Sequence, residues 1–264
     1  MKLQKKLEAN NKANDFRVEI ENKIDKLPKD KTIRIDSILS FYNKKDLFNG
    51  NTLISYEGQT ILQKSYNNDL TSNTINSQFR IGSLSNKTFT SMIIAQLEDE
   101  NKLSYNDRIE KYLPNYPNGK VTISHQSGIP NFLSNKSYLP QILTNKYSIE
   151  EVVTLFCSDI LEFEPGSKFE YSNSNFVILS LIAEKIIGKD YKEILNQYIF
   201  NPLDMKNTYF GESIDKKALV TGFMYGNHEI KYDAQNAGGA GGITSTTSDL
   251  LKWSNSFNEE QLLP

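Results

Sequence analysis

Apolar residues occur in short β-prone runs early in the chain and in longer runs of helical character over most of the remainder. The runs 52–56 and 60–64 flank Glu57-Gly58, and β-prone runs around a glycine predict a β-hairpin. Before the hairpin, the scattered apolar residues of segment 3–27 indicate a partly helical lead-in. A second short helix is expected around residues 33–39.

The rest of the chain carries the spacing and capping signals of helices. Segment 83–101 is apolar on most sides, which is typical of a buried helix. Ser148 followed by Glu151 has the spacing of a capping box, which marks a helix start. The glycine-rich segment 238–242 is expected to form a flexible loop. Further helices are expected at 174–187, ending at Gly188, at 190–200, ending before Pro202, and after a cap at Thr246–Asp249.

The length and composition are those of a folded protein with a substantial core. The chain has 264 residues, of which 38% are hydrophobic and 11% aromatic, so a wholly disordered chain is excluded. The order of the expected elements predicts an α+β fold. We expect a helical lead-in over residues 1–47 and one main domain over residues 48–264.

Charge and residue counts exclude several classes of function. The 30 Lys and Arg residues are balanced by 32 Asp and Glu residues, so no basic excess favours a nucleic-acid partner. Cys157 is the single cysteine and excludes an intrachain disulfide. Two histidines, His125 and His228, are too few for a His-rich metal cluster. No apolar run approaches the length that spans a membrane.

Ser83 and Lys87 are the first candidates for chemistry. Ser83 stands at the expected start of the buried helix, where the helix dipole and free N–H groups favour negative charge. Lys87 follows four residues later and therefore shares its helix face. A lysine so placed can accept the serine proton if burial lowers its pKa. The same spacing also fits a helix-capping serine followed by a surface lysine.

Tyr171 and Asn173 form a second candidate pair, just before the expected helix at 174–187. A tyrosine can transfer a proton, and an asparagine can hydrogen-bond a carbonyl or amide group. A helix start with a packed aromatic side chain explains the same residues equally well. The pair alone therefore leaves both interpretations open.

Taken in order, many short segments over residues 48–258 resemble the serine β-lactamase and penicillin-binding protein superfamily. Within it, the chain is similar to the class C-related serine hydrolases, which include D-aminopeptidase-like and esterase-like members. The segments that carry the resemblance are Phe79-Arg-Ile-Gly-Ser-Leu-Ser, Leu103-Ser-Tyr-Asn-Asp, Tyr112-Leu-Pro, Ser127-Gly-Ile-Pro-Asn, Phe163-Glu-Pro-Gly, Tyr171-Ser-Asn, Gly188-Lys-Asp-Tyr, Asn201-Pro-Leu-Asp-Met, Ala240-Gly-Gly-Ile-Thr-Ser and Asp249-Leu-Leu-Lys-Trp.

The resemblance implies an acyl-serine hydrolase of an amide, an ester or a β-lactam. By this resemblance Ser83 is the nucleophile, Lys87 the activating base, Tyr171 the second acid/base, and Asn173 a contact to the substrate amide. The implied fold is an antiparallel sheet packed against helices, with an all-helical lobe. No cofactor and no metal are implied, and the partner is a small-molecule or peptide substrate.

Relatives of this kind usually work in the periplasm, outside the cell or on the cell envelope. No apolar signal core follows the N-terminal lysines. The sequence therefore leaves the localisation unknown.

One departure from the family pattern lies between the serine and the lysine. The family spacing is Ser-x-x-Lys, whereas Asn86 adds one residue between Ser83 and Lys87. An extra residue rotates an ideal helix by about 100°. A π-bulge absorbs such a residue and keeps both ends in register; otherwise Lys87 faces solvent and the pair is lost. The one strict Ser-x-x-Lys match, Ser213 to Lys216, lacks a helical context and is taken as chance.

Two further departures concern the segments after the expected Ser83 helix. The stretch before Ser127 is shorter than in the family, so His125 is expected to be a supporting or surface residue rather than a catalyst. The family's third motif, Lys-Thr-Gly or His-x-Gly, does not occur between Trp253 and Pro264. We therefore expect a C-terminally incomplete domain that lacks strands and one oxyanion donor.

Three interpretations follow from these departures. The leading one is a serine hydrolase of the β-lactamase-related class, whose activity in this chain is uncertain. The second is a non-catalytic member of the same fold that binds a peptide, a cell-wall fragment or a partner protein. The third is a structural or interaction protein that uses an exposed sheet edge to dimerise. Besides a substrate, the expected partners of the incomplete domain are a second copy in an oligomer or a complementing C-terminal segment.

Overall fold

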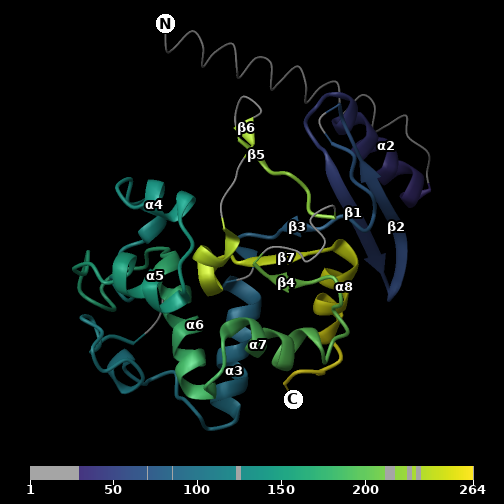
Figure 1. Cartoon of the computed structure of the whole chain (residues 1–264). Coiled ribbons are helices and arrows are strands. Elements are labelled where there is room, and N and C mark those ends of the chain that lie inside the picture. The colour runs from purple at the N-terminus through teal and green to yellow at the C-terminus, as the bar shows by residue number, and fades with distance from the viewer. Residues whose placement is uncertain are drawn as a thin grey trace, which may run out of the picture. The chain divides into compact units, whose positions relative to one another are not determined.

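The computed structural model describes residues 30–69, 71–84, 86–122, 126–211, 218–224, 228–229 and 233–263 (Figure 1). The expected lead-in helix at 3–27, His125 and the Ser213–Lys216 match lie outside these residues. Contacts within the chain divide it into two compact units, Met1–Ile75 and Asn76–Pro264. The expected boundary between residues 47 and 48 stays a prediction, because most of the segment before it is not described.

The first unit contains the predicted hairpin. Strand β1 (Gly50–Tyr56) pairs antiparallel with β2 (Gln59–Tyr66). Glu57 and Gly58 both adopt positive φ, 49° and 76°. Two left-handed residues in a two-residue turn match the right-handed twist of the strands, which is why such turns close hairpins. The hairpin prediction is confirmed.

Helix α2 (Lys31–Lys44) belongs to the same unit and confirms the second predicted helix. Two hydrogen bonds tie it to β2, because the Asp36 carboxylate accepts from Lys64 Nζ and from Tyr66 Oη, both at 2.6 Å. The bond from Lys64 contributes most to lowering the pKa of Asp36, and the bond from Tyr66 adds to it. The carboxylate therefore stays ionised at neutral pH and links helix to strand.

The second unit combines a small antiparallel sheet with helices. The strand order is β3 (Phe79–Arg80), β7 (Ile243–Ser245), β4 (Tyr209–Phe210), and β7 pairs antiparallel with both neighbours. A separate pair is formed by β5 (Phe223–Met224) and β6 (His228–Glu229). The helices are α3 (Ser91–Asp99), α4 (Leu139–Thr144), α5 (Ile149–Phe156), α6 (Asn173–Ile187), α7 (Tyr191–Leu195) and α8 (Thr247–Ser256).

Short helices of other types complete the second unit. Two segments, η1 (Asn86–Thr90) and η4 (Asn196–Phe200), are π-helical. Three 3₁₀ segments are η2 (Ile109–Lys111), η3 (Phe132–Ser134) and η5 (Ala234–Ala240). Figure 1 shows α4 and α5 at one end of the β3–β7–β4 sheet and α8 at the other. The predicted α+β architecture is confirmed.

The predicted helix ends form through the expected capping groups. Ser148 Oγ accepts from Glu151 N, and the Glu151 carboxylate accepts from Ser148 N, which completes the capping box of α5. Helix α6 ends at Gly188, whose φ of 74° is the left-handed conformation that glycine adopts without strain. Thr246 Oγ1 caps α8 by accepting from Asp249 N. The capping predictions are confirmed.

The aromatic part of the core is centred on Phe89. Its ring stacks on Trp253, with ring centroids 4.4 Å apart, and meets Phe200 edge-on at 5.9 Å. Phe89, Ile93 and Leu97 are fully buried at four-residue intervals. The predicted helix therefore has one buried face, and the turn that leads into α3 is π-helical rather than α-helical.

A buried polar network joins η1, α6, α7 and η5. The single hydroxyl proton of Thr90 goes to Gly239 O at 2.7 Å, so the Tyr191 hydroxyl is the donor to Thr90 Oγ1 at 2.8 Å. Burial raises the pKa of Tyr191, which keeps this donor protonated. Gly239 N donates to Ser180 Oγ at 3.2 Å, and Ser180 Oγ donates to Val177 O at 2.7 Å.

This network corrects the expectation of a flexible loop at 238–242. Gly238, Gly239 and Ala240 are buried and belong to η5. A Cβ on Gly239 would lie 2.6 Å from Phe176 O and 2.8 Å from Thr90 Oγ1. The glycine permits close backbone packing here, a role that sequence composition alone does not distinguish from flexibility.

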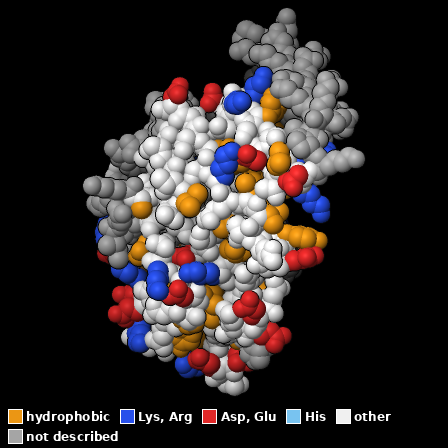
Figure 2. Space-filling view, turned by 90° about the vertical axis from the view of Figure 1, so that its right-hand side faces the viewer, with side chains coloured by type: hydrophobic (Ala, Val, Ile, Leu, Met, Phe, Trp, Pro, Cys, Tyr) orange, Lys and Arg blue, Asp and Glu red, His pale blue; other side chains and the backbone are white. Residues whose placement is uncertain are grey.

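Charges of both signs are interspersed on the face seen in Figure 2, with hydrophobic side chains between them. Single-sign patches are therefore not a feature of the described residues on this face. None of the helices in the described ranges combines the length and hydropathy needed to cross a bilayer.

We expect Gly239→Ala to lower the free energy of unfolding by about 1–3 kcal/mol, because the added methyl overpacks a rigid polar junction. Urea unfolding followed by circular dichroism measures the change. Ser254→Ala is the control, since it truncates an exposed side chain of α8. Equal stability of the two variants would contradict this packing account.

Candidate active site

Ser83 lies where the chain leaves the sheet. Strand β3 pairs with β7, and Ile81 N continues this pairing by donating to Ile243 O at 3.0 Å. Gly82 then adopts a φ of 55°, which turns the chain out of the sheet in a conformation that glycine allows without strain. Ser83 follows in this turn, with an exposed side chain.

The inserted residue falls in a π-helical turn. The segment Asn86–Thr90 is π-helical and leads directly into α3. A π-turn holds one residue more than an α-turn, so it accommodates Asn86 without rotating the rest of the helix. The buried series that begins at Phe89 accordingly stays on the core side of α3. The side chains of Asn86 and Lys87 lie outside the described part of the structure, and the role of Lys87 stays a prediction.

Tyr171 and Asn173 are joined at the start of α6. Ser172 is the residue before the first helical position, and Asn173 begins the helix. The Tyr171 hydroxyl donates to Asn173 Oδ1 at 3.0 Å. Tyr171 is half-buried, whereas Asn173 is only 8% exposed. Because only Ser172 separates them and Asn173 is fixed in the first turn of α6, the Tyr171 hydroxyl and the Asn173 amide stay within hydrogen-bonding distance.

Asn131 fixes the other side of the Asn173 amide. Its Oδ1 accepts from Asn173 Nδ2 at 3.2 Å and from Asn173 N at 3.4 Å. The segment that ends in Asn131 is itself bound to α6, since Ser127 Oγ donates to Asn175 Oδ1 at 2.7 Å and Ser174 Oγ donates to Pro130 O. Asn131 is the last residue of the segment Ser127-Gly-Ile-Pro-Asn, and this role was not predicted from the sequence. A polar side chain at the end of this segment is the feature of the sequence that could have indicated a hydrogen-bonding role.

Ser83 and Asn173 line one cavity of about 240 Å³. The remaining lining comes from Gly82, Leu133, Leu139, Ile142, Leu143, Asn236, Ala237, Ala240 and Gly241. Tyr171 is not among the lining residues and is connected to the cavity through its bond to Asn173. The structure thus brings three of the four predicted residues into one neighbourhood, and their catalytic roles stay predictions.

Asn236 holds the wall of this cavity and was not singled out from the sequence. Its side chain is 1% exposed, and its Nδ2 donates to Ile142 O at 2.8 Å and to Asn145 O at 2.7 Å. Its Oδ1 accepts from Tyr147 N at 2.9 Å. One amide thereby fastens the end of α4 and the following loop to η5. Sequence gave no signal for this role because its partners are distant backbone groups.

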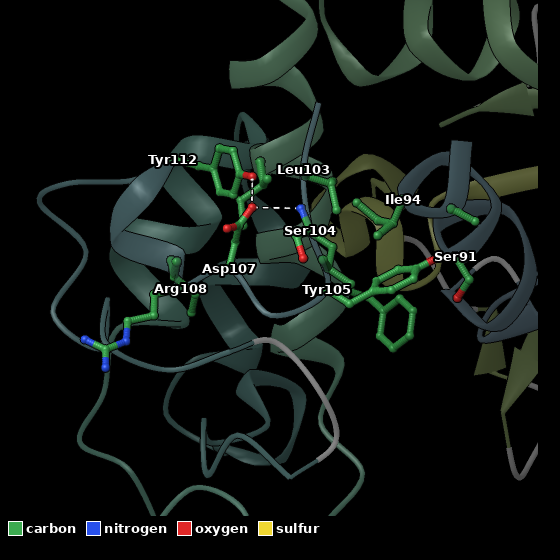
Figure 3. Close-up of a pocket in the computed structure, with 13 residues that line it drawn as sticks. Ser91, Ile94, Leu103, Ser104, Tyr105, Asp107, Arg108 and Tyr112 are labelled. Carbon is green, nitrogen blue, oxygen red and sulfur yellow. Dashed lines mark hydrogen bonds between the residues drawn. The ribbon is translucent and has the colours of Figure 1, made fainter. Parts of the chain in front are cut away.

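A larger cavity of about 410 Å³ lies between α3, α6 and the segment around η2 (Figure 3). Figure 3 shows Tyr112 and Ser104 directed at the Asp107 carboxylate, which accepts from Ser104 N at 2.7 Å and from the Tyr112 hydroxyl. The bonds from Lys111 and Tyr112 hold the pKa of Asp107 at about 2. The Asp107 carboxylate is a weak base, and its oxygens already accept hydrogen bonds from Ser104, Lys111 and Tyr112. The cavity lined by Ser83 is therefore the better candidate for an active site.

Across the described ranges, His, Cys, Asp and Glu side chains form no group of three that could hold a metal ion. The groups gathered at the Ser83 cavity are a hydroxyl, amides and, through Asn173, a phenol. Such groups suit nucleophilic attack, hydrogen bonding to a carbonyl or amide, and proton transfer.

Sequence comparison identifies the class of protein to which this fold and cavity belong. The family model for Beta-lactamase matches residues 43–264, which is most of the chain. The chain therefore belongs to the beta-lactamase family, a family of hydrolases that includes penicillin-binding proteins.

Individual relatives agree with this assignment. The teichoic acid D-alanine hydrolase of Staphylococcus aureus is 28% identical over 225 residues, which cover 80% of this chain and 54% of the relative. Penicillin-binding protein 4* of Bacillus subtilis is 27% identical over 266 residues, which cover 90% of this chain and 58% of the relative. The chain thus spans little more than half the length of either curated relative.

The fold is confirmed by solved structures. The D-amino acid amidase from Ochrobactrum anthropi SV3 superimposes with a TM-score of 0.73 at 25% identity. The match covers 86% of this chain and 71% of the amidase. The expected β-lactamase-like fold is therefore present in the chain.

We expect Asn131→Ala to lower the free energy of unfolding by about 1–3 kcal/mol, because two buried donors of Asn173 lose their acceptor. Asn131→Asp keeps a carboxyl oxygen in place and should lose less. Ser134→Ala removes only the exposed acceptor of Asn131 Nδ2 and serves as the control. Denaturant unfolding of the three variants measures these differences, and equal losses for the alanine and aspartate variants would contradict the role given to Asn131.

Proposed function

We propose that the chain is a serine hydrolase that cleaves an ester or amide bond through an acyl-serine intermediate. The observation that carries the proposal is the cavity shared by Ser83 and Asn173, with Tyr171 hydrogen-bonded to Asn173. Membership of the beta-lactamase family supports the same chemistry. We assign Ser83 as nucleophile, Lys87 as base, Tyr171 as proton donor and Asn173 as a substrate contact.

The proposed reaction has two stages. Lys87 accepts the hydroxyl proton of Ser83 while Ser83 Oγ attacks the substrate carbonyl carbon. The bond to the leaving alcohol or amine then breaks, and Tyr171 supplies the proton that the leaving group needs. In the second stage a water molecule attacks the acyl-serine ester while the Tyr171 phenolate accepts a proton from that water. The bond between Ser83 Oγ and the acyl carbon then breaks, Lys87 returns its proton to Ser83 Oγ, and the acid leaves with the starting protonation states restored.

Two observations support this assignment over an inert site. The π-turn at Asn86–Thr90 accommodates the extra residue that otherwise argues against a working Ser83–Lys87 pair. The named relatives, a D-alanine hydrolase and a D-amino acid amidase, support ester or amide bonds as the class of bond that is cleaved.

The single thiol of the chain does not compete with Ser83 for acyl groups. Cys157 is buried, and this burial raises the pKa of its thiol to about 12. The thiolate is the reactive form of cysteine, so a protonated and inaccessible thiol is inert toward acylating reagents. Cys157 therefore does not account for an adduct on the folded chain.

We expect one covalent adduct when the chain is incubated with a fluorophosphonate or a penicillin, and no adduct with Ser83→Ala. Intact-protein mass spectrometry detects the shift. Ser254→Ala, which removes an exposed serine of α8, should react like wild type. Circular dichroism establishes that each variant is folded.

Two outcomes would contradict the proposal. An adduct that persists in folded Ser83→Ala would place the nucleophile elsewhere. A folded wild-type chain that forms no adduct with either reagent would favour a non-catalytic member of the family that binds its ligand in this cavity.

A further inference from the structure

The cavity beside Ser83 is apolar over most of its wall. Among its lining residues, the apolar side chains are Leu133, Leu139, Ile142, Leu143, Ala237 and Ala240. None of the described lining residues carries a charge. Leu133 and Leu143 are also partly exposed at 36% and 46%, so apolar surface continues to solvent.

The amides in the wall are already engaged with protein groups. The side-chain amide of Asn236 donates hydrogen bonds to Ile142 O and Asn145 O, and its oxygen accepts one from Tyr147 N. Asn173 donates to Asn131 and accepts from Tyr171. The cavity therefore offers little polar recognition beyond Ser83 itself.

The position of Tyr171 indicates which part of a substrate enters the cavity. The leaving group needs a proton from Tyr171, and Tyr171 does not line the cavity. The acyl part stays bonded to Ser83 Oγ, and Ser83 does line the cavity. The leaving group therefore departs on the Tyr171 side, and the acyl part occupies the apolar space.

We propose that the cavity is an acyl-binding pocket for an uncharged, apolar acyl chain longer than an acetyl or D-alanyl group. This inference rests on the proposed function, since it assigns the acyl part of the same reaction. A cavity of about 240 Å³ leaves most of its apolar wall uncovered when a single methyl group enters it. An ammonium group on the acyl chain would find no carboxylate among the described lining residues.

The expected preference follows from burial of methylene groups. Each buried methylene is worth about 0.8 kcal/mol, which corresponds to roughly fourfold in an equilibrium or rate ratio. Two additional methylenes thus raise kcat/KM by about fifteenfold. The preference applies to the acyl side and not to the alcohol side of the ester.

The experiment compares p-nitrophenyl acetate, butanoate and hexanoate as substrates of the wild-type chain, with alkyl acetates of increasing alcohol length as the second series. We expect kcat/KM to rise by about fifteenfold from acetate to butanoate, and alcohol length to change it less than twofold. Ser83→Ala provides the background rate.

Leu143→Ser tests the pocket itself. Leu143 is partly exposed at the end of α4, so its replacement is compatible with folding. We expect the butanoate-to-acetate ratio to fall at least threefold in this variant. Leu155→Ser is the matched control, because Leu155 is a 53% exposed leucine of α5 that does not line the cavity.

The outcomes separate this inference from the function on which it rests. Ser83-dependent hydrolysis with a flat acyl series, or with an unchanged ratio in Leu143→Ser, would overturn the pocket and leave the hydrolase standing. A rise along the alcohol series instead would assign the cavity to the leaving group and overturn the proposal. Absence of Ser83-dependent turnover and of any adduct would overturn both.

Discussion

The geometry of the candidate site depends on the buried hydrogen bonds around Thr90. Thr90 is the last residue of the π-turn, and its hydroxyl connects Tyr191 of α7 to the backbone of Gly239 in η5. Unpaired polar groups at such depth are costly, so the bonds fix the relative positions of these elements.

The wall of the Ser83 cavity is held in place by close backbone packing and by hydrogen bonds of asparagine side-chain amides. Gly239 lets η5 lie against α6, and Asn236 in the same segment fastens the end of α4. Asn173 starts α6 and is held by Asn131. Ser83 reaches the same cavity from strand β3. Elements far apart in sequence thus converge through backbone bonds rather than through a compact sequence motif.

The sequence predicted what depends on local chemistry. The hairpin around Glu57-Gly58 and the capping box at Ser148 follow from turn and helix-end preferences that act over a few residues, and both are present. The glycine-rich segment was misjudged because composition does not reveal that Gly239 packs against α6. Asn131 and Asn236 were missed because their partners come from other segments. The π-turn was one of two outcomes that helical geometry left open for Asn86.

The most direct test of the account is a crystal structure of the chain after reaction with a hexyl fluorophosphonate. We predict a phosphorus atom bonded to Ser83 Oγ and a hexyl chain lying against Leu139 and Ile142 in the apolar cavity. A label on a different residue, or a hexyl chain that lies outside the cavity while phosphorus is bonded to Ser83, would contradict it.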